Sequence, residues 1–377
     1  IVARHKGQEA FAFENIPLDD APTYRLFTDG KTEAVFQFES RGMQGMLRDA
    51  KPTRLEDLIA LNALYRPGPM DLIPSFVARK HGREEIEYPH PLVAEMLSET
   101  YGIMVYQEQV MQTAQILGGY SLGGADLLRR AMGKKKVEEM AQHRQIFRDG
   151  AAKNGITEPK ADEIFDLMEK FAGYGFNKSH AAAYSLLAYH TAWLKVHYTA
   201  EFFCANMTVE MDDTDKLKVL FEDAQKNFNL TFEPPDVNRG SYRFEPMSDK
   251  VIRYGLGAVK GTGQQAIEAI VKARDEGGPF TSLFDFCVRV ERTKLNKRTV
   301  DALIKAGAFD SLQLNRAAMS ASIDLAFEFA VTTEANANQS GLFDMGDSHA
   351  ASTQEPALVE ATPWGVKERL TLEKTAI

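Results

Sequence analysis

The segment from Lys170 to Ala200, KFAGYGFNKSHAAAYSLLAYHTAWLKVHYTA, constrains the fold more than any other part of the chain. It contains no Asp or Glu, although the whole chain carries a formal net charge of −9. Gly173 and Gly175 flank Tyr174 and predict a turn, because glycine adopts backbone angles that a β-carbon disfavours. The residues that follow this turn predict a helix.

The start of that helix gathers basic and aromatic side chains. Ser179 is the expected N-cap, since its hydroxyl can accept hydrogen bonds from the first free amides. Lys178, His180 and Tyr184 would then lie beside the positive end of the helix dipole. This arrangement suits a nucleotide triphosphate or a DNA backbone. Composition alone equally allows a buried helix with a few long cationic side chains.

Length and composition describe an ordinary soluble protein of two or three domains, with 377 residues, 44% hydrophobic and 26% charged. Cys204 and Cys287 lie far apart and near no histidine cluster, so they are expected to be core residues in a reducing cytosol. No stretch is long and apolar enough to span a membrane, and no signal-peptide pattern follows Ile1. The expectation is a cytoplasmic protein without a membrane partner, and a piece of a longer chain.

The pattern of apolar residues predicts a mainly α fold with short β elements, of the α+β class. Short strands are expected at Val35–Phe38 and Tyr101–Tyr106. A hairpin is expected from Tyr242 to Tyr254, around Ser248 and Asp249. Helices are expected over most of the rest of the first half.

Composition shifts divide the chain into three parts. Residues 1–210 would form one helical domain, and residues 211–335 would form a smaller second domain. Residues 336–377 are rich in Ser, Thr, Ala, Asn and Glu and predict a flexible linker.

Two further groups of cations stand out in the first part. The rigid loop Arg66-Pro67-Gly68-Pro69 displays Arg66. The segment from Arg129 to Lys136 carries five positive charges and no negative one, namely Arg129, Arg130, Lys134, Lys135 and Lys136. Such a run is usually a solvated face. Its position after a helix, with Gly133 as the expected helix end, makes a clamp for an anion a serious alternative.

The second part contains a helix–hairpin–helix pattern between Leu256 and Arg274. Its hairpin is Lys260-Gly261-Thr262-Gly263, followed by a helix with Ala266 and Ile270 facing inward. The glycines would let the backbone approach a phosphate, and such contacts read the DNA backbone and not its sequence. A helix-capping turn that binds nothing is the alternative. A second unit, Lys294–Phe309, lacks the Gly-x-Gly and is expected to pair structurally with the first.

A short peptide in the polar tail, Gln339-Ser340-Gly341-Leu342-Phe343, places two apolar residues together. Gln339, Leu342 and Phe343 could form a docking peptide that orders on a partner, although chance could also produce it. No group of residues predicts catalysis. The acidic pair Asp213 and Asp215 lies at a polar helix start and is expected to cap that helix.

Several motifs resemble the bacterial DNA polymerase III alpha subunit family, the C-family replicative polymerases. They run collinearly from about Thr32 to Leu312: TEAVFQFESRGM, ALNALYRPGP, RKHGREEI, YGIMVYQEQVMQTAQ, GGADLLRRAMGKKK and EKFAGYGFNKSHAAAYSLLAYHTAWLK. The resemblance implies a fingers domain, then a little-finger domain with paired helix–hairpin–helix units. It also implies that Gln339–Phe343 is a peptide that binds the sliding clamp.

The resemblance further implies a DNA-directed DNA polymerase, a nucleotidyltransferase of DNA replication. Its partners would be primer–template DNA, a deoxynucleoside triphosphate, the sliding clamp and other polymerase III holoenzyme subunits. Mg²⁺ would be held by aspartates of a palm domain upstream of Ile1, so this fragment alone is expected to be inactive. The fingers would contact the triphosphate through cations and the base or sugar through Tyr174 and His180. The cations are Arg66, Arg129, Arg130, Lys134 and Lys178.

Two other interpretations stay open. An error-prone polymerase of the same family would share the fingers but often lacks a good clamp peptide, so Gln339–Phe343 favours the replicative form. A non-enzymatic DNA-binding scaffold with a helix–hairpin–helix is disfavoured by the long fingers-like half.

Overall fold

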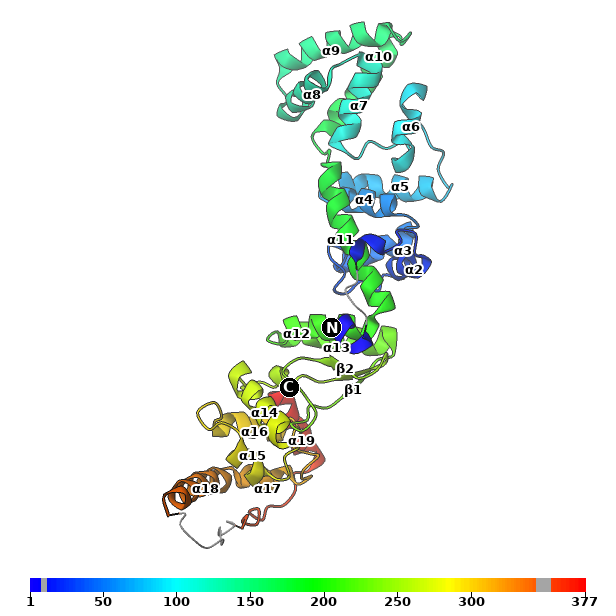
Figure 1. The fold of residues 1–377 in the computed structure, drawn as a ribbon. Helices are drawn as coiled ribbons and strands as arrows, with labels where there is room; N and C mark the ends of the chain where they lie inside the picture. The colour runs from blue at the N-terminus through cyan, green and yellow to red at the C-terminus, as the bar shows by residue number, and fades with distance from the viewer. Residues whose placement is uncertain (8–11, 344–353) are drawn as a thin grey trace. The chain divides into compact units, whose positions relative to one another are not determined.

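The computed structural model describes residues 1–7, 12–343 and 354–377. Helices dominate these residues, and their one sheet has three short strands, which confirms the predicted mainly α fold with short β elements (Figure 1). The helices are α1 Val2–Lys6, α2 Ala21–Thr28, α3 Arg41–Ala50, α4 Leu55–Leu64, α5 Ile73–Lys80, α6 Ala94–Leu97, α7 Gln107–Gly118, α8 Leu122–Lys134, α9 Val137–Ala152, α10 Glu158–Ala172, α11 Lys178–His197, α12 Thr199–Val209, α13 Thr214–Phe228, α14 Gln264–Gly277, α15 Leu283–Arg289, α16 Lys297–Lys305, α17 Arg316–Ala321, α18 Ile323–Phe343 and α19 Val366–Ala376. The strands are β1 Thr231–Glu233, β2 Glu245–Pro246 and β3 Val251–Arg253. Short 3₁₀ helices lie at Phe13–Asn15, Pro69–Leu72, Pro91–Val93, Ser98–Thr100 and Leu256–Ala258.

The chain forms two compact units. The first comprises residues 12–197, and the second comprises the described parts of 1–11 and 198–377. Helix α12 belongs to the second unit because it packs on α13 and on strand β2. The sequence places a domain limit at residue 210, which stays a prediction about the family's domains.

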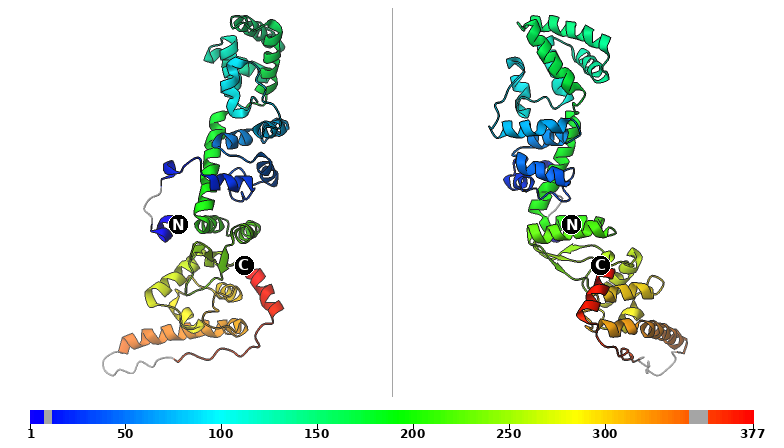
Figure 2. Two further views of the ribbon diagram at one scale, coloured as in Figure 1. Left: turned by 90° about the vertical axis from the view of Figure 1, so that its right-hand side faces the viewer. Right: turned by 180° about the vertical axis from the view of Figure 1, so that it is seen from behind.

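Helix α11 is the central element of the first unit, and α2 and α4 pack along it (Figures 1 and 2). Its buried face carries small residues at spacings of three and four, namely Ala181, Ser185, Ala188 and Ala192. Small side chains at this spacing let a second helix approach closely. Most of the interval without acidic residues therefore forms this central helix, and its small residues form the packing face.

The predicted strand at Val35–Phe38 is wrong. This segment forms tight turns, with the Val35 N–H donating to Thr32 and the Phe38 N–H donating to Val35. The backbone has positive φ at Ala34 and Gln37, which is incompatible with a strand. Val35 and Phe38 are nevertheless fully buried, so their apolar character reflects the core and not a sheet.

Helices α7, α8, α9 and α10 form a second part of this unit, packed around a common apolar core. The strand predicted at Tyr101–Tyr106 before α7 is also wrong. Tyr101 and Gly102 have positive φ, and only Tyr106 forms a β-bridge, with Phe176. The segment is buried without being a strand.

The second unit contains the small sheet, in the order β1-β3-β2. Strand β3 pairs parallel with β1 and antiparallel with β2. The predicted hairpin around Ser248 and Asp249 is confirmed, since the Met247 N–H donates to Val251 across the turn. Arg253 is buried in the sheet and donates to Glu233 at 2.9 Å.

Helices α14–α18 surround a separate apolar core in the same unit. The sequence predicts a flexible linker over 336–377, but two helices fall within it. Helix α18 continues to Phe343, and α19 packs on α16. Arg316 holds α19 by an ion pair with Glu373 at 2.6 Å, and Ala376 is buried.

Helix α19 is therefore anchored by a buried end and an ion pair, two long-range contacts that composition does not reveal.

In the part of the chain that the structure describes, no helix combines the length and hydropathy that crossing a membrane requires.

Candidate nucleotide site and nucleic-acid interface

The loops before α7 and α11 are joined by backbone hydrogen bonds. The Phe176 N–H donates to Val105 at 3.2 Å, and the Gln107 N–H donates to Phe176 at 2.9 Å. These bonds form the parallel bridge between Tyr106 and Phe176. They bring the starts of the two helices side by side.

The N-terminus of α11 is capped by Asn177. Its Oδ1 accepts from the His180 N–H at 2.8 Å, so the prediction of Ser179 as the N-cap is wrong. The helix starts at Lys178, two residues earlier than a Ser179 cap would allow. An Asn side chain caps as well as a Ser side chain.

An internal carboxylate lies on this helix N-terminus. Glu108 accepts from the Lys178 backbone N–H at 3.0 Å through one oxygen and from Asn177 Nδ2 at 3.0 Å through the other. The ammonium of Lys178 forms an ion pair with Glu99 at 2.5 Å. The site thus holds anionic groups, as the dipole and the free amides favour.

Arg66 is held by backbone carbonyls. It donates to Tyr174 O at 2.6 Å and to Ala63 O at 2.9 Å. Its guanidinium carbon lies 4.5 Å from the centre of the Phe176 ring. Burial lowers the pKa of Arg66, but an arginine stays charged at neutral pH. Arg66 therefore joins the Arg66–Pro69 loop to the glycine turn.

Gly68 completes this contact. Its φ is +98°, and a β-carbon there would come within 2.7 Å of Tyr174 Cε1. The phenol ring of Tyr174 thus lies directly against the loop, with almost half of the side chain exposed. A glycine is therefore favoured at position 68, where the loop and the turn meet.

A row of aromatic rings extends from this turn along α11. His180 lies 5.4 Å from Phe176 and 4.3 Å from Tyr184, and Tyr184 stacks on Phe36 at 5.3 Å. His180 and Tyr184, four residues apart, share one face of α11, and Phe176 lies just before the helix. Sequence reasoning missed Phe176, which this spacing could have revealed, and Phe36, which it could not.

The cations of α8 form a separate group. Arg129 and Arg130 both pair with Asp126 at 2.8 Å. The hydrogen bond from Arg129 holds the pKa of the Asp126 carboxyl below its usual range. Lys134 is exposed and ends the helix.

The expected helix end at Gly133 is wrong, because α8 continues to Lys134 and Lys135 takes the left-handed cap conformation. Helix α8 packs on α7, α9 and α10, and α11 packs on α2 and α4. Among the residues with described contacts, no hydrogen bond or ion pair joins the α8 cations to Lys178 or His180. The structure therefore brings together Arg66, Tyr174, Lys178 and His180, and it places Arg129, Arg130 and Lys134 on a separate helix, α8.

The predicted DNA hairpin has an open face. Gly261 has a φ of +84°, and Gly263 is the N-cap of α14 with no side chain capping it. A β-carbon at Gly263 would meet nothing within 4 Å. Lys260 is exposed, and its backbone N–H donates to Ala376 of α19 at 2.7 Å.

The hydroxyl of Thr262 is used inside the hairpin, where it donates to Val259 O at 2.6 Å. Thr262 therefore shapes the loop through this bond. The side chains of Lys260 and the amides at the start of α14 are the groups left to meet an anion.

The second helix–hairpin–helix unit, Lys294–Phe309, contacts this hairpin, as predicted. Thr299 Oγ1 lies 3.5 Å from Gly261 O, and Lys294 Nζ lies 3.4 Å from Gln265 Oε1. Lys294, Asn296 and Thr299 line one side of a cavity of about 610 Å³, and the hairpin lines the other. The Lys294–Phe309 unit thus adds Lys294 to the open face, and the sequence analysis did not assign this lysine to the interface.

The backbone of the predicted clamp peptide lies in the last turns of α18. The side chains of Gln339, Leu342 and Phe343 lie outside the described residues. Within the described residues, no three His, Cys, Asp or Glu side chains are grouped so that they could hold a metal ion.

Comparison with known families identifies both parts of the chain. Residues 1–155 match the family described as the bacterial DNA polymerase III alpha subunit finger domain. Residues 229–319 match the helix-hairpin-helix motif. The first match falls mostly on the first unit, and the second lies within the second unit and includes the hairpin region.

Curated relatives named DNA polymerase III subunit alpha match nearly the whole chain. The protein of Neisseria meningitidis serogroup A is 59% identical over 96% of this chain and 31% of its own length. That of Xylella fastidiosa strain Temecula1 is 56% identical over 96% and 30%, and that of Escherichia coli K12 is 49% identical over 95% and 32%. The chain therefore spans about a third of these relatives. It belongs to the bacterial DNA polymerase III alpha subunit family, of which it covers the finger and helix–hairpin–helix region.

Proposed function

We propose that this chain holds the incoming nucleotide and the primer–template DNA within a replicative DNA-directed DNA polymerase. The main support for nucleotide binding is the position of Glu108. Its carboxylate accepts hydrogen bonds from the Lys178 backbone N–H and from the Asn177 side chain at the start of α11. A group of negative charge is stable at that position, and a phosphate has the same charge and acceptor chemistry. Nucleotide binding would replace this internal anion with a phosphate.

The cations would neutralise the triphosphate. Lys178 would exchange Glu99 for a phosphate oxygen, and Arg129 and Arg130 would exchange Asp126 for others. Exchange of one anion for another avoids leaving a cation unpaired. Lys134 is already exposed. Tyr174 and His180 would face the base or sugar, and Arg66 would fix the loop that supports Tyr174.

In the reaction, the primer 3′-hydroxyl attacks the α-phosphate, and pyrophosphate leaves. Mg²⁺ would supply charge neutralisation at the reacting phosphates. We place its ligands outside this chain, on the palm domain that the family resemblance implies. The work of this chain is then to bind and orient the nucleotide.

The helix–hairpin–helix units would hold duplex DNA through its backbone. Lys260 and the amides that follow Gly261 and Gly263 would contact one phosphate. Lys294, which lines a cavity with these two glycines and with Glu268, would add a further positive charge. Contacts of this kind give affinity that depends on salt and little on sequence.

Gln339, Leu342 and Phe343 would bind the sliding clamp. A short peptide binds weakly alone, but the hairpin region would hold the DNA that the ring encircles, so the two contacts reinforce each other. Leu342→Ala with Phe343→Ala should abolish clamp binding and shorten the products of each binding event. Leu314→Ala, at a highly exposed leucine, is the matched control. Native clamp affinity in the double variant would contradict this role.

Primer extension tests the proposal as a whole. The isolated chain should bind primer–template DNA and extend no primer at any Mg²⁺ concentration. The whole polymerase, which would work with its other subunits in the cytoplasm, should extend the same primer. Templated incorporation by the purified chain would overturn the assignment. Failure of the chain to bind primer–template would overturn the DNA-holding role.

A further inference from the structure

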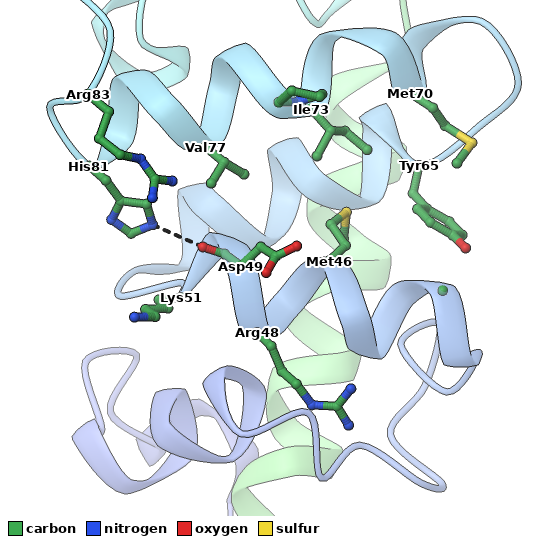
Figure 3. A pocket seen from close by; sticks show the side chains of 12 residues that line it. Met46, Arg48, Asp49, Lys51, Tyr65, Met70, Ile73, Val77, His81 and Arg83 are labelled. Carbon is green, nitrogen blue, oxygen red and sulfur yellow. Dashed lines mark hydrogen bonds between the residues drawn. The ribbon is translucent and has the colours of Figure 1, made fainter.

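A groove on the first unit lies apart from the residues assigned above. It is a cavity of about 1110 Å³ between α3 and α5, and it ends on Tyr65 at the end of α4 (Figure 3). Its floor is apolar, with Met46 and Val77 buried and Ile73 half-buried. Small-molecule sites usually span about 300–1,000 Å³, so this groove has enough volume for part of a polymer.

One end of the groove is basic. Lys51 and Arg83 lie there with His81, beside the carboxylate of Asp49, whereas Arg48 lines the groove from α3 and points away from these three (Figure 3). Counting three permanent cations and one anion gives a local charge of +2 with His81 neutral, in a chain whose net charge is −9. A concave surface of one sign in a chain of the opposite sign attracts a charged ligand.

These cations are exposed. Lys51 and Arg83 form no ion pair among the described residues. Arg48 donates to the backbone carbonyl of Asp29, and His81 Nε2 lies 3.1 Å from the Asp49 carbonyl oxygen. Backbone carbonyls orient the two side chains and leave the charge of Arg48 without a carboxylate partner in the described part of the chain.

The other end of the groove adjoins the candidate nucleotide site. Tyr65 and Met70 line the groove and flank the Arg66–Pro69 loop. That loop contacts Tyr174 through Arg66 and Gly68. A β-carbon at Gly42 would come within 2.1 Å of the Tyr65 hydroxyl, so this glycine lets the Tyr65 ring lie against α3. The groove is thus continuous with the surface that faces the nucleotide.

We propose that this groove binds the unpaired template strand of DNA. The apolar floor and the Tyr65 ring would contact bases, and Lys51, Arg83 and Arg48 would contact phosphates. Continuity with the Arg66–Pro69 loop fits a strand that runs on from the base paired with the incoming nucleotide. This inference rests on the proposed polymerase function, because only that function puts a single strand next to the nucleotide site.

Oligonucleotide binding to the full chain tests the inference. Fluorescence anisotropy of labelled dT12 is measured at several salt concentrations for the wild type and for Lys51→Glu with Arg83→Glu. Arg25→Glu with Lys153→Glu is the matched control, since both residues are exposed cations of the same unit and the charge change is equal. The groove variant should raise Kd about tenfold beyond the control. It should reduce the slope of log K against log salt by about 1.4, for two phosphates at ~0.7 each.

Photocrosslinking locates the contact. Benzoylphenylalanine in place of Met70, an exposed groove residue, should crosslink to dT12, and the same group in place of Ile146 on α9 should not. Equal affinities of the groove and control variants would overturn the inference. So would a crosslink from position 70 to polypeptide and not to DNA in the whole polymerase, since that would identify a protein-binding groove. The assay contains no nucleotide, so its failure would leave the proposed triphosphate contacts standing.

Discussion

The carboxylate of Glu108 accepts a hydrogen bond at 3.0 Å from the backbone N–H of Lys178, a residue 70 positions further along the chain. The bond ties the first turn of α7 to the first turn of α11. It also places a negative charge where the helix dipole and the free amides favour one. The same contact therefore stabilises the fold without ligand and marks the position where a phosphate would fit.

Glu108→Gln should reduce the stability of the first unit by about 1 kcal/mol, because the neutral amide loses the interaction with the helix dipole and one charge-assisted hydrogen bond. Urea unfolding followed by Trp193 fluorescence in a Trp364→Phe background reports on this unit alone, since these are the two tryptophans of the chain. Glu95→Gln, at an exposed glutamate on α6, is the control. Identical unfolding midpoints for the two variants would show that Glu108 has no such role.

Gly68→Ala should destabilise the same unit more than Gly82→Ala. Both glycines have positive φ, so both variants carry the cost of about 1–2 kcal/mol for a side chain in that conformation. Only Gly68 adds a close contact, 2.7 Å from the Tyr174 ring, whereas Gly82 faces open space. The same urea assay measures the difference. Equal losses would mean that the loop moves away from Tyr174 without cost.

Sequence reasoning predicted local features well. The hairpin around Ser248, the Gly261–Gly263 turn and the helix after Asn177 each depend on residues within a few positions of one another. Glycine placement and helix start signals are local, so a single sequence carries them.

The features that the sequence did not reveal depend on distant partners. Glu99 and Glu108 meet Lys178 from 79 and 70 positions away. No periodicity encodes such a meeting. The apolar residues of Val35–Phe38 suggest a strand, but two residues with positive φ fold them into turns, and burial alone explains their character. Helix α8 continued past Gly133, because a glycine costs a helix only about 1 kcal/mol.

Gly263→Val should weaken duplex binding by the chain and leave its fold intact. The added side chain enters open space in front of the hairpin, where a phosphate would approach. Gly365→Val is a close control, because Gly365 also caps a helix without a side-chain bond and also faces open space. Anisotropy with a labelled duplex measures the effect. If both variants bind duplex like the wild type, the hairpin has a structural role only.

Cys204 and Cys287 should not react with thiol reagents in the native chain at pH 8. Burial raises the pKa of the Cys287 thiol to about 12 and raises the pKa of Cys204 as well. A raised pKa keeps the thiol protonated, and the thiolate is the reactive form. Absorbance with a disulfide reagent should show two thiols after unfolding in urea and almost none before. Rapid native labelling of either residue would contradict its burial.

The most direct test of the central claim is the KM for nucleotides of the whole polymerase carrying Arg129→Ala, Arg130→Ala or Lys178→Ala. Each charge-assisted contact to phosphate contributes about 1.5–3 kcal/mol. Its removal should therefore raise KM or lower kcat roughly 10- to 100-fold. Primer–template affinity should change less, and Lys153→Ala, at an exposed lysine beyond α9, should change neither. The account predicts that kcat/KM for nucleotides falls at least tenfold in all three site variants. Kinetics like those of the Lys153→Ala control in all three would assign these cations to a solvated face and contradict the account.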